Sequence, residues 1–536
     1  MVRWCHEKVT MGRYEISRKL THGLKLMLFG TLAMACSHAT PEERSSLNLP
    51  PQQFAEASPS KPPPKSPRLK QEAFRPLEDD IDELLHSSDI PGVSVGLIVD
   101  RKVFWKQAFG VSDRTTKKSM TTETVMRVGS VSKVFTGLAL MALRDEGRFR
   151  LDDPVVSIVP ELAHVVYPTS DSPRITFRHL LTHSSGLPRV GRLDYYSNPN
   201  SPVTTTILAE ALSGEHLIFA PGTETLYSNL GSGVASVAVG RLAGKELRTY
   251  LSELIFQPLG MTHTTFSQKD ARTFNMATGY KSTSEGLVPK PHWNLGVAEG
   301  MGGLYSSLDD VVRFAVWQTN AWPPRHGEET GPVARATVRE SQLSLGGGNN
   351  SSVFGANWII GSHPRFGYQV SHTGSTHQYS ACIRLFPKSG VGIVTLANVG
   401  MLAKEPGKAA AAKIADTALS WLKKVLPKVE EPVSDALNKA SNAFLALFDA
   451  PTEKQIAALF HPTFLASIPV PKMRQMFAGM RKQLGVCSVT SGTAKSKTEA
   501  RFLLTCGTTK LNLGLVVSPV PPHQIQGMRI KPRKDD

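Results

Sequence analysis

The segment Gly129-Ser130-Val131-Ser132-Lys133 places a hydroxyl nucleophile and an amine three residues apart. Positions i and i+3 of a helix share a face, so the side chains of Ser130 and Lys133 can point into one pocket. A serine hydroxyl becomes an effective nucleophile when an adjacent base takes its proton. A lysine loses its charge when it is desolvated or lies near other cations, and it then serves as that base. The pair predicts acyl transfer without a metal or a cofactor.

The spacing alone does not identify the site, because Ser58-Pro59-Ser60-Lys61 repeats it within a proline-rich stretch. The stretch 37–78 buries too little apolar surface to fold, so it is expected to be an extended tether in which nothing desolvates Lys61. The segment Val131–Glu146, in contrast, is apolar on nearly all sides and is followed by Gly147, a favoured helix-ending residue. An apolar helix of this kind is buried, so Ser130 at its start is expected to face the protein interior.

A second proton-transfer group is expected in the segment Pro221–Gly231, which contains Tyr227 and Asn229. A phenol beside a cationic lysine has a lowered pKa and can pass protons to a leaving group. Asn229 can hold the lysine or a substrate carbonyl. The triplet Tyr196-Ser197-Asn198 repeats this pattern, but Pro199 follows it in a polar, loop-like stretch. Tyr227 is therefore preferred.

The third element is Ser371-His372-Thr373-Gly374-Ser375, at the end of a predicted strand. Gly374 has no side chain to block a ligand that lies along the strand edge. The backbone N–H groups of Ser130 and Ser375 can then form an oxyanion hole.

In their order along the chain, Ser130-x-x-Lys133, Tyr227-x-Asn229 and His372-Thr373-Gly374 resemble the serine β-lactamase and penicillin-binding-protein superfamily. The chain is more closely similar to the class C-related serine hydrolases, which include esterases and D-amino-acid peptidases. The runs Leu180–Pro188 and Gly302–Ser307 support the resemblance, which spans about residues 79–425.

The resemblance implies a role for each matched residue. Ser130 attacks the carbonyl, while Lys133 and Tyr227 accept and donate protons. The implied substrate-binding residues are Asn229, His372, Thr373, Gly374 and Ser375. His183 and Gly303 are expected to serve packing and backbone shape.

One departure from the family concerns His372, which stands where the typical lactamase or transpeptidase has a lysine that anchors a substrate carboxylate. A histidine is largely neutral at pH 7 and anchors a carboxylate less well. The expected activity is therefore that of an esterase, amidase or D-amino-acid peptidase. A β-lactamase or DD-carboxypeptidase proper, and a protein that binds penicillin or wall fragments without turnover, remain alternatives.

The predicted fold is mixed α/β (α+β), with an antiparallel sheet flanked by helices and a helical subdomain over residues 79–426. Its elements are expected at Gly92–Val99, Val103–Gly110, Tyr368–His372, Gln378–Phe386, Val391–Ala397 and, as a closing helix, Ala409–Leu426. Strands from both ends of this domain are expected to share the sheet.

The tail, residues 427–536, is predicted to be a small α+β domain whose layout resembles the NTF2-like domains. It is expected to hold helices over Ser434–Phe448 and Lys472–Leu484 and three short strands. Cys487 and Cys506 flank a predicted hairpin, and in an oxidising compartment they are expected to form a disulfide. Cys382 lies in an apolar run and is expected in the core.

The N-terminus predicts export. Basic residues precede the apolar run Leu26–Ala35, and Cys36 follows directly. This pattern indicates a signal segment over residues 1–36, and the position of Cys36 resembles a bacterial lipobox. We expect lipid attachment at Cys36 and a membrane-anchored lipoprotein of the periplasm or cell envelope. Simple secretion is the alternative.

The charge of the chain and the spacing of its His and Cys residues limit the classes of partner that we expect. The formal net charge of +16 arises partly from the signal segment, and the basic residues are scattered. A nucleic-acid partner is therefore not expected, and no His/Cys cluster has zinc spacing, so no metal is expected either. The expected partner is a small-molecule or peptide substrate; the oligomeric state is not predicted.

Overall fold

The computed structural model describes residues 69–195, 200–346, 353–426, 433–496 and 498–532. The predicted signal segment, Cys36, most of the tether and the triplet Tyr196-Ser197-Asn198 lie outside the described residues. The described residues form two parts, 69–426 and 433–532, each with its own hydrophobic core. Among the described residues, no helix is both long enough and apolar enough to cross a membrane.

An eight-stranded sheet forms the centre of the larger part, in the order β3-β2-β1-β12-β11-β10-β9-β8, and its paired strands are antiparallel. Its strands are β1 (Gly92–Val99), β2 (Lys102–Asp113), β3 (Lys118–Ser119), β8 (Val353–Phe354), β9 (Ile359–His363), β10 (Gly367–Ser375), β11 (Ser380–Phe386) and β12 (Val391–Ala397). Because β1 pairs with β12, strands from both ends of the domain share the sheet, as predicted.

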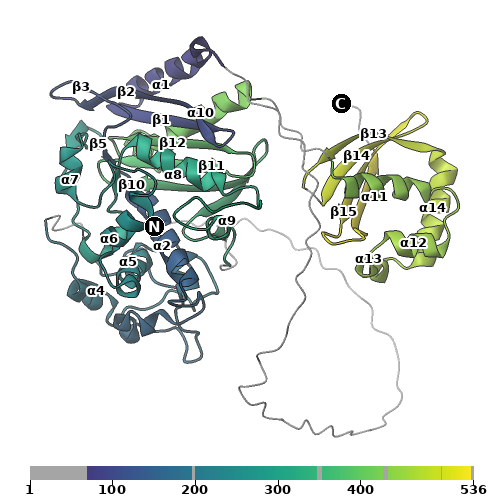
Figure 1. Cartoon of the computed structure of the whole chain (residues 1–536), viewed down its shortest axis with the longest axis horizontal. Coiled ribbons are helices and arrows are strands. Elements are labelled where there is room, and N and C mark those ends of the chain that lie inside the picture. The colour runs from purple at the N-terminus through teal and green to yellow at the C-terminus, as the bar shows by residue number, and fades with distance from the viewer. Residues whose placement is uncertain (1–68, 196–199, 347–352, 427–432, 497, 533–536) are drawn as a thin grey trace, which may run out of the picture. The chain divides into compact units, whose positions relative to one another are not determined.

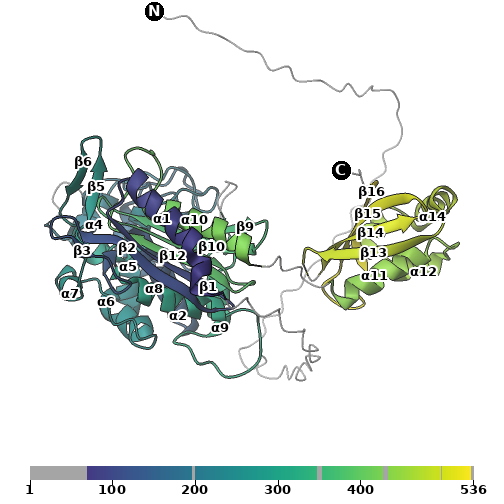
Figure 2. The same ribbon diagram turned by 90° about the horizontal axis from the view of Figure 1, so that it is seen from above.

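Helices cover both faces of this sheet, which explains why every residue of β1 is buried. Val93 and Val95 belong to the core under α1 (Arg75–Ser87) and α10 (Ala410–Val425), which run along one face (Figure 2). On the other face, a Cβ at Gly96 would meet Val312 of α8 (Leu308–Asn320). The predicted mixed fold with a helix-flanked antiparallel sheet is confirmed.

The remaining helices form a layer on the side of the sheet away from α1 and α10 (Figure 1). In the larger part, these α-helices are α2 (Ser132–Asp145), α3 (Phe177–Leu181), α4 (Thr205–Leu212), α5 (Asn229–Ala243), α6 (Leu247–Leu251), α7 (Gln268–Thr273), α8 (Leu308–Asn320) and α9 (Arg335–Ser341). Short 3-10 turns include η3 (Gly129–Val131) and η7 (Gly296–Met301), and two-stranded sheets pair β4 (Met126–Arg127) with β7 (Tyr305–Ser306) and β5 (Tyr280–Thr283) with β6 (Gly286–Pro289).

The folded part begins earlier than the expected boundary at residue 79. A 3-10 turn, η2 (Gln71–Phe74), leads directly into α1. The centroid of the Phe74 ring lies 5.6 Å from that of the Trp105 ring and 5.1 Å from that of the Trp421 ring. The tether therefore does not reach residue 78, because three aromatic rings distant in sequence bury this segment.

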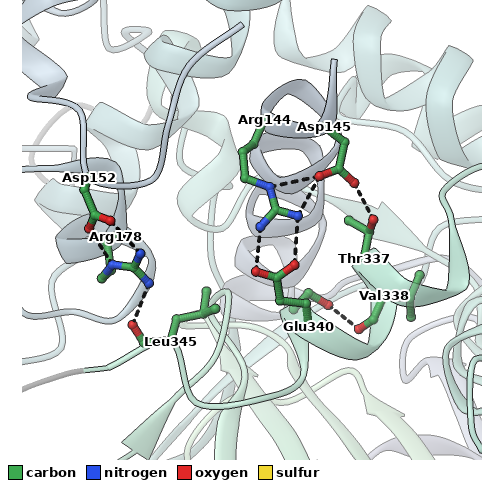
Figure 3. Close-up of polar contacts among 9 residues, drawn as sticks. Arg144, Asp145, Asp152, Arg178, Thr337, Val338, Glu340 and Leu345 are labelled. Carbon is green, nitrogen blue, oxygen red and sulfur yellow. Dashed lines mark hydrogen bonds and ion pairs between the residues drawn. The ribbon is translucent and has the colours of Figure 1, made fainter. Parts of the chain in front are cut away.

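Charged groups fix the C-terminal end of α2, the helix that carries Lys133 (Figure 3). The Arg144 guanidinium donates to both oxygens of Glu340 on α9, at 2.7 and 2.9 Å, and also to Asp145. The Asp145 carboxylate in turn accepts a hydrogen bond from Thr337 on α9. Nearby, Arg178 of α3 donates to both oxygens of Asp152 at 2.6 and 2.8 Å and to the Leu345 carbonyl. The contacts of Arg144 and Asp145 anchor the end of α2 that lies away from Ser130, while those of Arg178 join α3 to the segment after α2.

The smaller part packs helices against a four-stranded antiparallel sheet, β13-β14-β15-β16. Its elements are α11 (Asp435–Ala446), α12 (Glu453–Leu459), α13 (Pro462–Ser467), α14 (Val470–Leu484), β13 (Cys487–Ala494), β14 (Glu499–Cys506), β15 (Thr509–Val517) and β16 (Ile525–Pro532). Four strands are present rather than the expected three, because the edge strands β13 and β16 are mostly exposed and carry a weak apolar pattern. Cys487 and Cys506 lie opposite each other on β13 and β14 and are joined in a disulfide, while Cys382 is buried in the larger part.

Candidate active site

Ser130 is the middle residue of the turn η3, which leads directly into α2 at Ser132. Lys133 follows one helical turn later, and its Nζ donates to Ser130 Oγ at 3.1 Å and to the Met301 carbonyl. The lysine side chain is fully buried. The structure thus brings the nucleophile and the candidate base into direct contact.

The first turn of α2 is held in place by hydrogen bonds to distant segments. Ser132 Oγ donates to Gly129 O at 2.6 Å and accepts from the Leu304 N–H at 3.1 Å. The Asn357 side-chain amide donates to the Lys133 carbonyl at 3.1 Å. Because the bonds from Leu304 and Asn357 come from two segments far along the chain, the positions of Ser130 and Lys133 depend on the tertiary fold.

Burial sets the charge of the base. Desolvation lowers the pKa of Lys133 well below its usual value, and the nearby positive charge of Arg189 lowers it further. Within the described residues, no carboxylate forms an ion pair with Lys133. The unprotonated amine is thereby favoured, and this is the form that accepts a proton from a serine hydroxyl.

Tyr227 lies in the loop that precedes α5. Its ring centroid is 5.1 Å from Lys133 Nζ and 4.4 Å from the centroid of the His183 ring. The Tyr227 hydroxyl is buried near the Ser130 hydroxyl, and no described residue forms a hydrogen bond of regular geometry with it. Burial raises the pKa of Tyr227, and the opposing effects of the Ser130 hydroxyl and the Arg189 charge are smaller.

The expectation of a lowered phenol pKa is therefore wrong. It assumed a charged lysine beside the ring, but burial disfavours the charge on Lys133 as well as on Tyr227. Tyr227 keeps its proton and is suited to donate it.

Asn229 is the first residue of α5, and its side-chain amide donates to the Tyr195 hydroxyl at 3.2 Å. Its backbone N–H donates to the carbonyl of Arg189 at 2.7 Å. Neither contact goes to Lys133, so of the two roles expected for Asn229, these contacts do not support that of holding the lysine.

His183 and Gly303 have structural contacts. His183 Nδ1 accepts the N–H of Ser228 at 3.2 Å, and the buried ring packs against Tyr227. A Cβ at Gly303 would lie 2.9 Å from the Glu299 carbonyl oxygen, so only glycine fits without a shift. Both residues shape the backbone around the site.

His372, on β10, is buried and neutral. Desolvation lowers the pKa of His372 to about 3, and Lys133 contributes in the same direction. His372 Nδ1 lies 2.7 Å from the Thr373 carbonyl, so the ring donates from Nδ1 and leaves an acceptor lone pair on Nε2. That Nε2 atom is buried without a hydrogen-bond partner in the described part of the chain.

The end of β10 lies against η3 because two glycines allow close backbone contact. A Cβ at Gly374 would fall 1.8 Å from Val128 O and 3.1 Å from the Ser130 backbone nitrogen. A Cβ at Gly129, where φ is +54°, would fall 2.9 Å from the Ser375 backbone nitrogen. The backbone nitrogens of Ser130 and Ser375 thus lie on adjoining segments, as an oxyanion hole requires, while Thr373 is exposed beside them.

Sequence reasoning missed three contributors: the Met301 carbonyl, the Tyr195 hydroxyl and the Arg189 guanidinium, whose Cζ lies 5.3 Å from the centroid of the Tyr227 ring. A backbone carbonyl has no signature in sequence. Arg189 follows Pro188 in one of the supporting runs, but nothing in its type or spacing distinguished it. Within the described residues, no group of three or more His, Cys, Asp and Glu side chains could hold a metal.

The chain belongs to the Beta-lactamase family, whose pattern matches residues 77–418. Protein flp of Staphylococcus aureus (strain MRSA252) is 28% identical over 337 residues, which are 62% of this chain and 64% of flp. Beta-lactamase-like protein 2 of Dictyostelium discoideum is 29% identical over 259 residues, 47% of each chain. The match thus spans less than two thirds of the length of either curated relative.

A solved structure shares the fold. The octameric penicillin-binding protein homologue from Pyrococcus abyssi superposes with a TM-score of 0.55 at 22% identity, over 86% of this chain and 90% of that one.

The backbone contact at Gly374 leads to a first prediction. In Gly374→Ala, the added Cβ must displace η3 or β10, and a displacement of about 1 Å lowers the rate of acylation by roughly 10²-fold. The rate of fluorophosphonate labelling measures this. Gly361→Ala on β9 is the control, because its Cβ would meet nothing nearer than the Gln369 side chain at 3.7 Å. Equal labelling rates for the two variants would show that the contact does not position the site.

The burial of Lys133 leads to a second prediction. Because its pKa is lower in the folded protein than in the unfolded chain, the unfolded chain binds a proton that the folded site does not. The free energy of unfolding therefore rises with pH between these two pKa values. Lys133→Met removes this penalty, so we expect a more stable protein at neutral pH, an advantage that shrinks as pH approaches 10.5, and acylation slower by roughly 10²- to 10⁴-fold.

Chemical denaturation at several pH values, with labelling in parallel, measures both effects. The control is Lys102→Met, at an exposed lysine of β2. A Lys133→Met protein that is less stable than wild type at neutral pH would contradict the desolvation argument.

Proposed function

We propose that this protein is a serine hydrolase that acts through an acyl-enzyme on an ester, an amide or a D-amino-acid peptide. The observation that carries the proposal is the 3.1 Å contact between Lys133 Nζ and Ser130 Oγ, at a position where burial lowers the pKa of the lysine. A neutral amine at hydrogen-bond distance is the base that a serine nucleophile needs.

Acylation follows from these positions. Ser130 Oγ bonds to the substrate carbonyl carbon while its proton passes to Lys133 Nζ. The backbone N–H groups of Ser130 and Ser375 stabilise the negative charge on the carbonyl oxygen. As the bond to the leaving group breaks, the Tyr227 phenol gives that group a proton, and the Lys133 ammonium returns one to Tyr227. The lysine is then neutral again.

Deacylation needs a base for the incoming water. Lys133 is available once neutral, and the unpartnered Nε2 lone pair of His372 is a second acceptor within the site. Water adds to the acyl carbon, its proton goes to one of these nitrogens, and the bond to Ser130 Oγ breaks with return of a proton to the hydroxyl. A neutral side chain at residue 372 is better suited to general hydrolysis than a cationic side chain at the same strand position would be.

The second candidate function is binding without turnover. It is favoured by the solved structure of the same fold that is described as a penicillin-binding protein homologue. In such a protein the acyl-enzyme forms and persists. A β-lactamase or a DD-carboxypeptidase proper remains the alternative within the enzyme class.

Labelling at Ser130 tests the proposal. We expect a fluorophosphonate probe to label wild type and Ser58→Ala equally, and Ser130→Ala not at all, because the buried Lys133 amine lies beside the Ser130 hydroxyl. With p-nitrophenyl butyrate, continuous product release supports a hydrolase, whereas a single burst of one equivalent supports the binding protein. Labelling of Ser130→Ala at the wild-type rate would contradict both.

We further propose that the chain is exported and anchored by lipid at Cys36. The apolar run Leu26–Ala35 supports export. The Cys487–Cys506 disulfide supports it independently, since disulfides persist mainly in oxidising compartments.

Metabolic labelling with an alkyne-bearing fatty acid in a bacterial host tests the anchor. We expect label in the wild type and in Cys5→Ser, and none in Cys36→Ser, because a thioether-linked lipid requires that thiol. Label retained in Cys36→Ser, or unlabelled wild-type protein released into the medium, would exclude the lipoprotein.

A further inference from the structure

Arg189 is an exposed arginine whose backbone is fixed at the candidate active site. Its carbonyl accepts the N–H groups of Asn229 at 2.7 Å and Leu230 at 3.3 Å, the first two residues of α5. The same helix begins two residues after Tyr227. The position of Arg189 is therefore tied to the element that carries the candidate proton donor.

The guanidinium of Arg189 lies against the Tyr227 ring, with Cζ 5.3 Å from the ring centroid. Its charge reaches further into the site, since it contributes to the lowered pKa values of Lys133 and His183. Contact with an aromatic ring restrains the guanidinium while its N–H groups remain available for other partners.

Arg189 has no ion pair or side-chain hydrogen bond to another described residue. Neighbouring arginines differ in this respect, because Arg192 pairs with Glu215 and Arg178 pairs with Asp152. An exposed guanidinium that is held in place and lacks a carboxylate partner is suited to bind an anion in two parallel hydrogen bonds.

The other ionisable side chains that surround the Tyr227 ring are driven to their neutral forms. Burial lowers the pKa of Lys133, His183 and His372 and raises that of Tyr227. Several described residues place a charged group or a ring against the Tyr227 ring. Among them, Arg189 is therefore the one that carries a fixed positive charge.

We propose that Arg189 is the anion-recognition residue of this site and that it binds a carboxylate on the leaving-group side of the substrate. The inference rests on the proposed function, in which Tyr227 protonates the leaving group. Because Arg189 lies against that tyrosine, a group that it binds belongs to the departing part of the substrate. The favoured substrates are then acyl compounds whose leaving group carries a carboxylate.

Two thioesters with the same acyl group test the proposal: benzoylglycyl-thioglycolate, which has a carboxylate on the leaving group, and its methyl ester, which has none. The full-length protein is used, and thiol release gives kcat/KM for each. We expect wild type to prefer the carboxylate form and Arg189→Gln to lose that preference by about tenfold. The ratio of the two substrates cancels any change in the pKa of Lys133, which affects both equally.

Matched variants and added salt test whether the charge of Arg189 causes the preference for the substrate with a carboxylate. Arg192→Gln removes a nearby paired arginine and is expected to leave the ratio unchanged, while Arg189→Lys is expected to retain part of it. Added salt should reduce the wild-type preference, because an exposed charge is screened. An unchanged ratio in Arg189→Gln would overturn the assignment.

A binding readout keeps this test separate from that of the proposed function. Benzoylglycylglycine, which carries a carboxylate, is expected to slow fluorophosphonate labelling of Ser130 in wild type and not in Arg189→Gln. This comparison needs no turnover. Equal protection of both proteins, or protection of neither, would refute the role of Arg189, whereas labelling of Ser130→Ala would instead refute the proposed function.

Discussion

The rest of the site depends on the desolvation of Lys133. Its amine is fully buried at the start of an apolar helix, with the Ser130 hydroxyl and the Met301 carbonyl as its partners and no ion-paired carboxylate among the described residues. Burial of an unpaired charge is unfavourable, so the pKa of Lys133 is lowered and the unprotonated amine is favoured. An apolar residue would satisfy the packing at this position. Because burial favours its uncharged form, the lysine is instead suited to act as a base. The hydrogen bonds of Ser132 and Asn357 hold the helix where this occurs.

Burial favours the uncharged forms of the side chains in the site, and this determines whether each of them can donate or accept a proton. With an uncharged amine beside it, Tyr227 keeps its proton and can act as a donor rather than as a second base. His372 is neutral with its proton on Nδ1, so it presents an acceptor to the site rather than a cation. Among the described groups around the Tyr227 ring, the fixed positive charge is that of the exposed Arg189. The proposed proton transfer and the proposed anion recognition therefore involve different elements, the interior of the sheet and helices for the first and a loop for the second.

Much of the fold could be predicted because its central elements have strong patterns. The predominantly apolar runs of β1 and β12, each with a single hydroxyl residue, identify strands buried on both faces. Where prediction failed, the stabilising contacts were not local. Phe74 is ordered by Trp105 and Trp421, which lie far along the chain, and the exposed edge strand β16 gains its structure from pairing with β15. A composition of prolines and lysines, or of alternating polar residues, does not reveal such partners.

The sequence by itself determined which side chains can do the chemistry: Ser130 and Lys133 one helical turn apart, Tyr227 in a second segment and His372 in a third. Helical geometry makes the first pair a local property of the chain. Only the tertiary structure decided their protonation states and their surroundings, including the contact of Arg189 with Tyr227 and the approach of Gly374 to Val128. The physical reason is that residue type and spacing define local geometry, whereas a pKa depends on the depth of burial and on charges that other segments bring close.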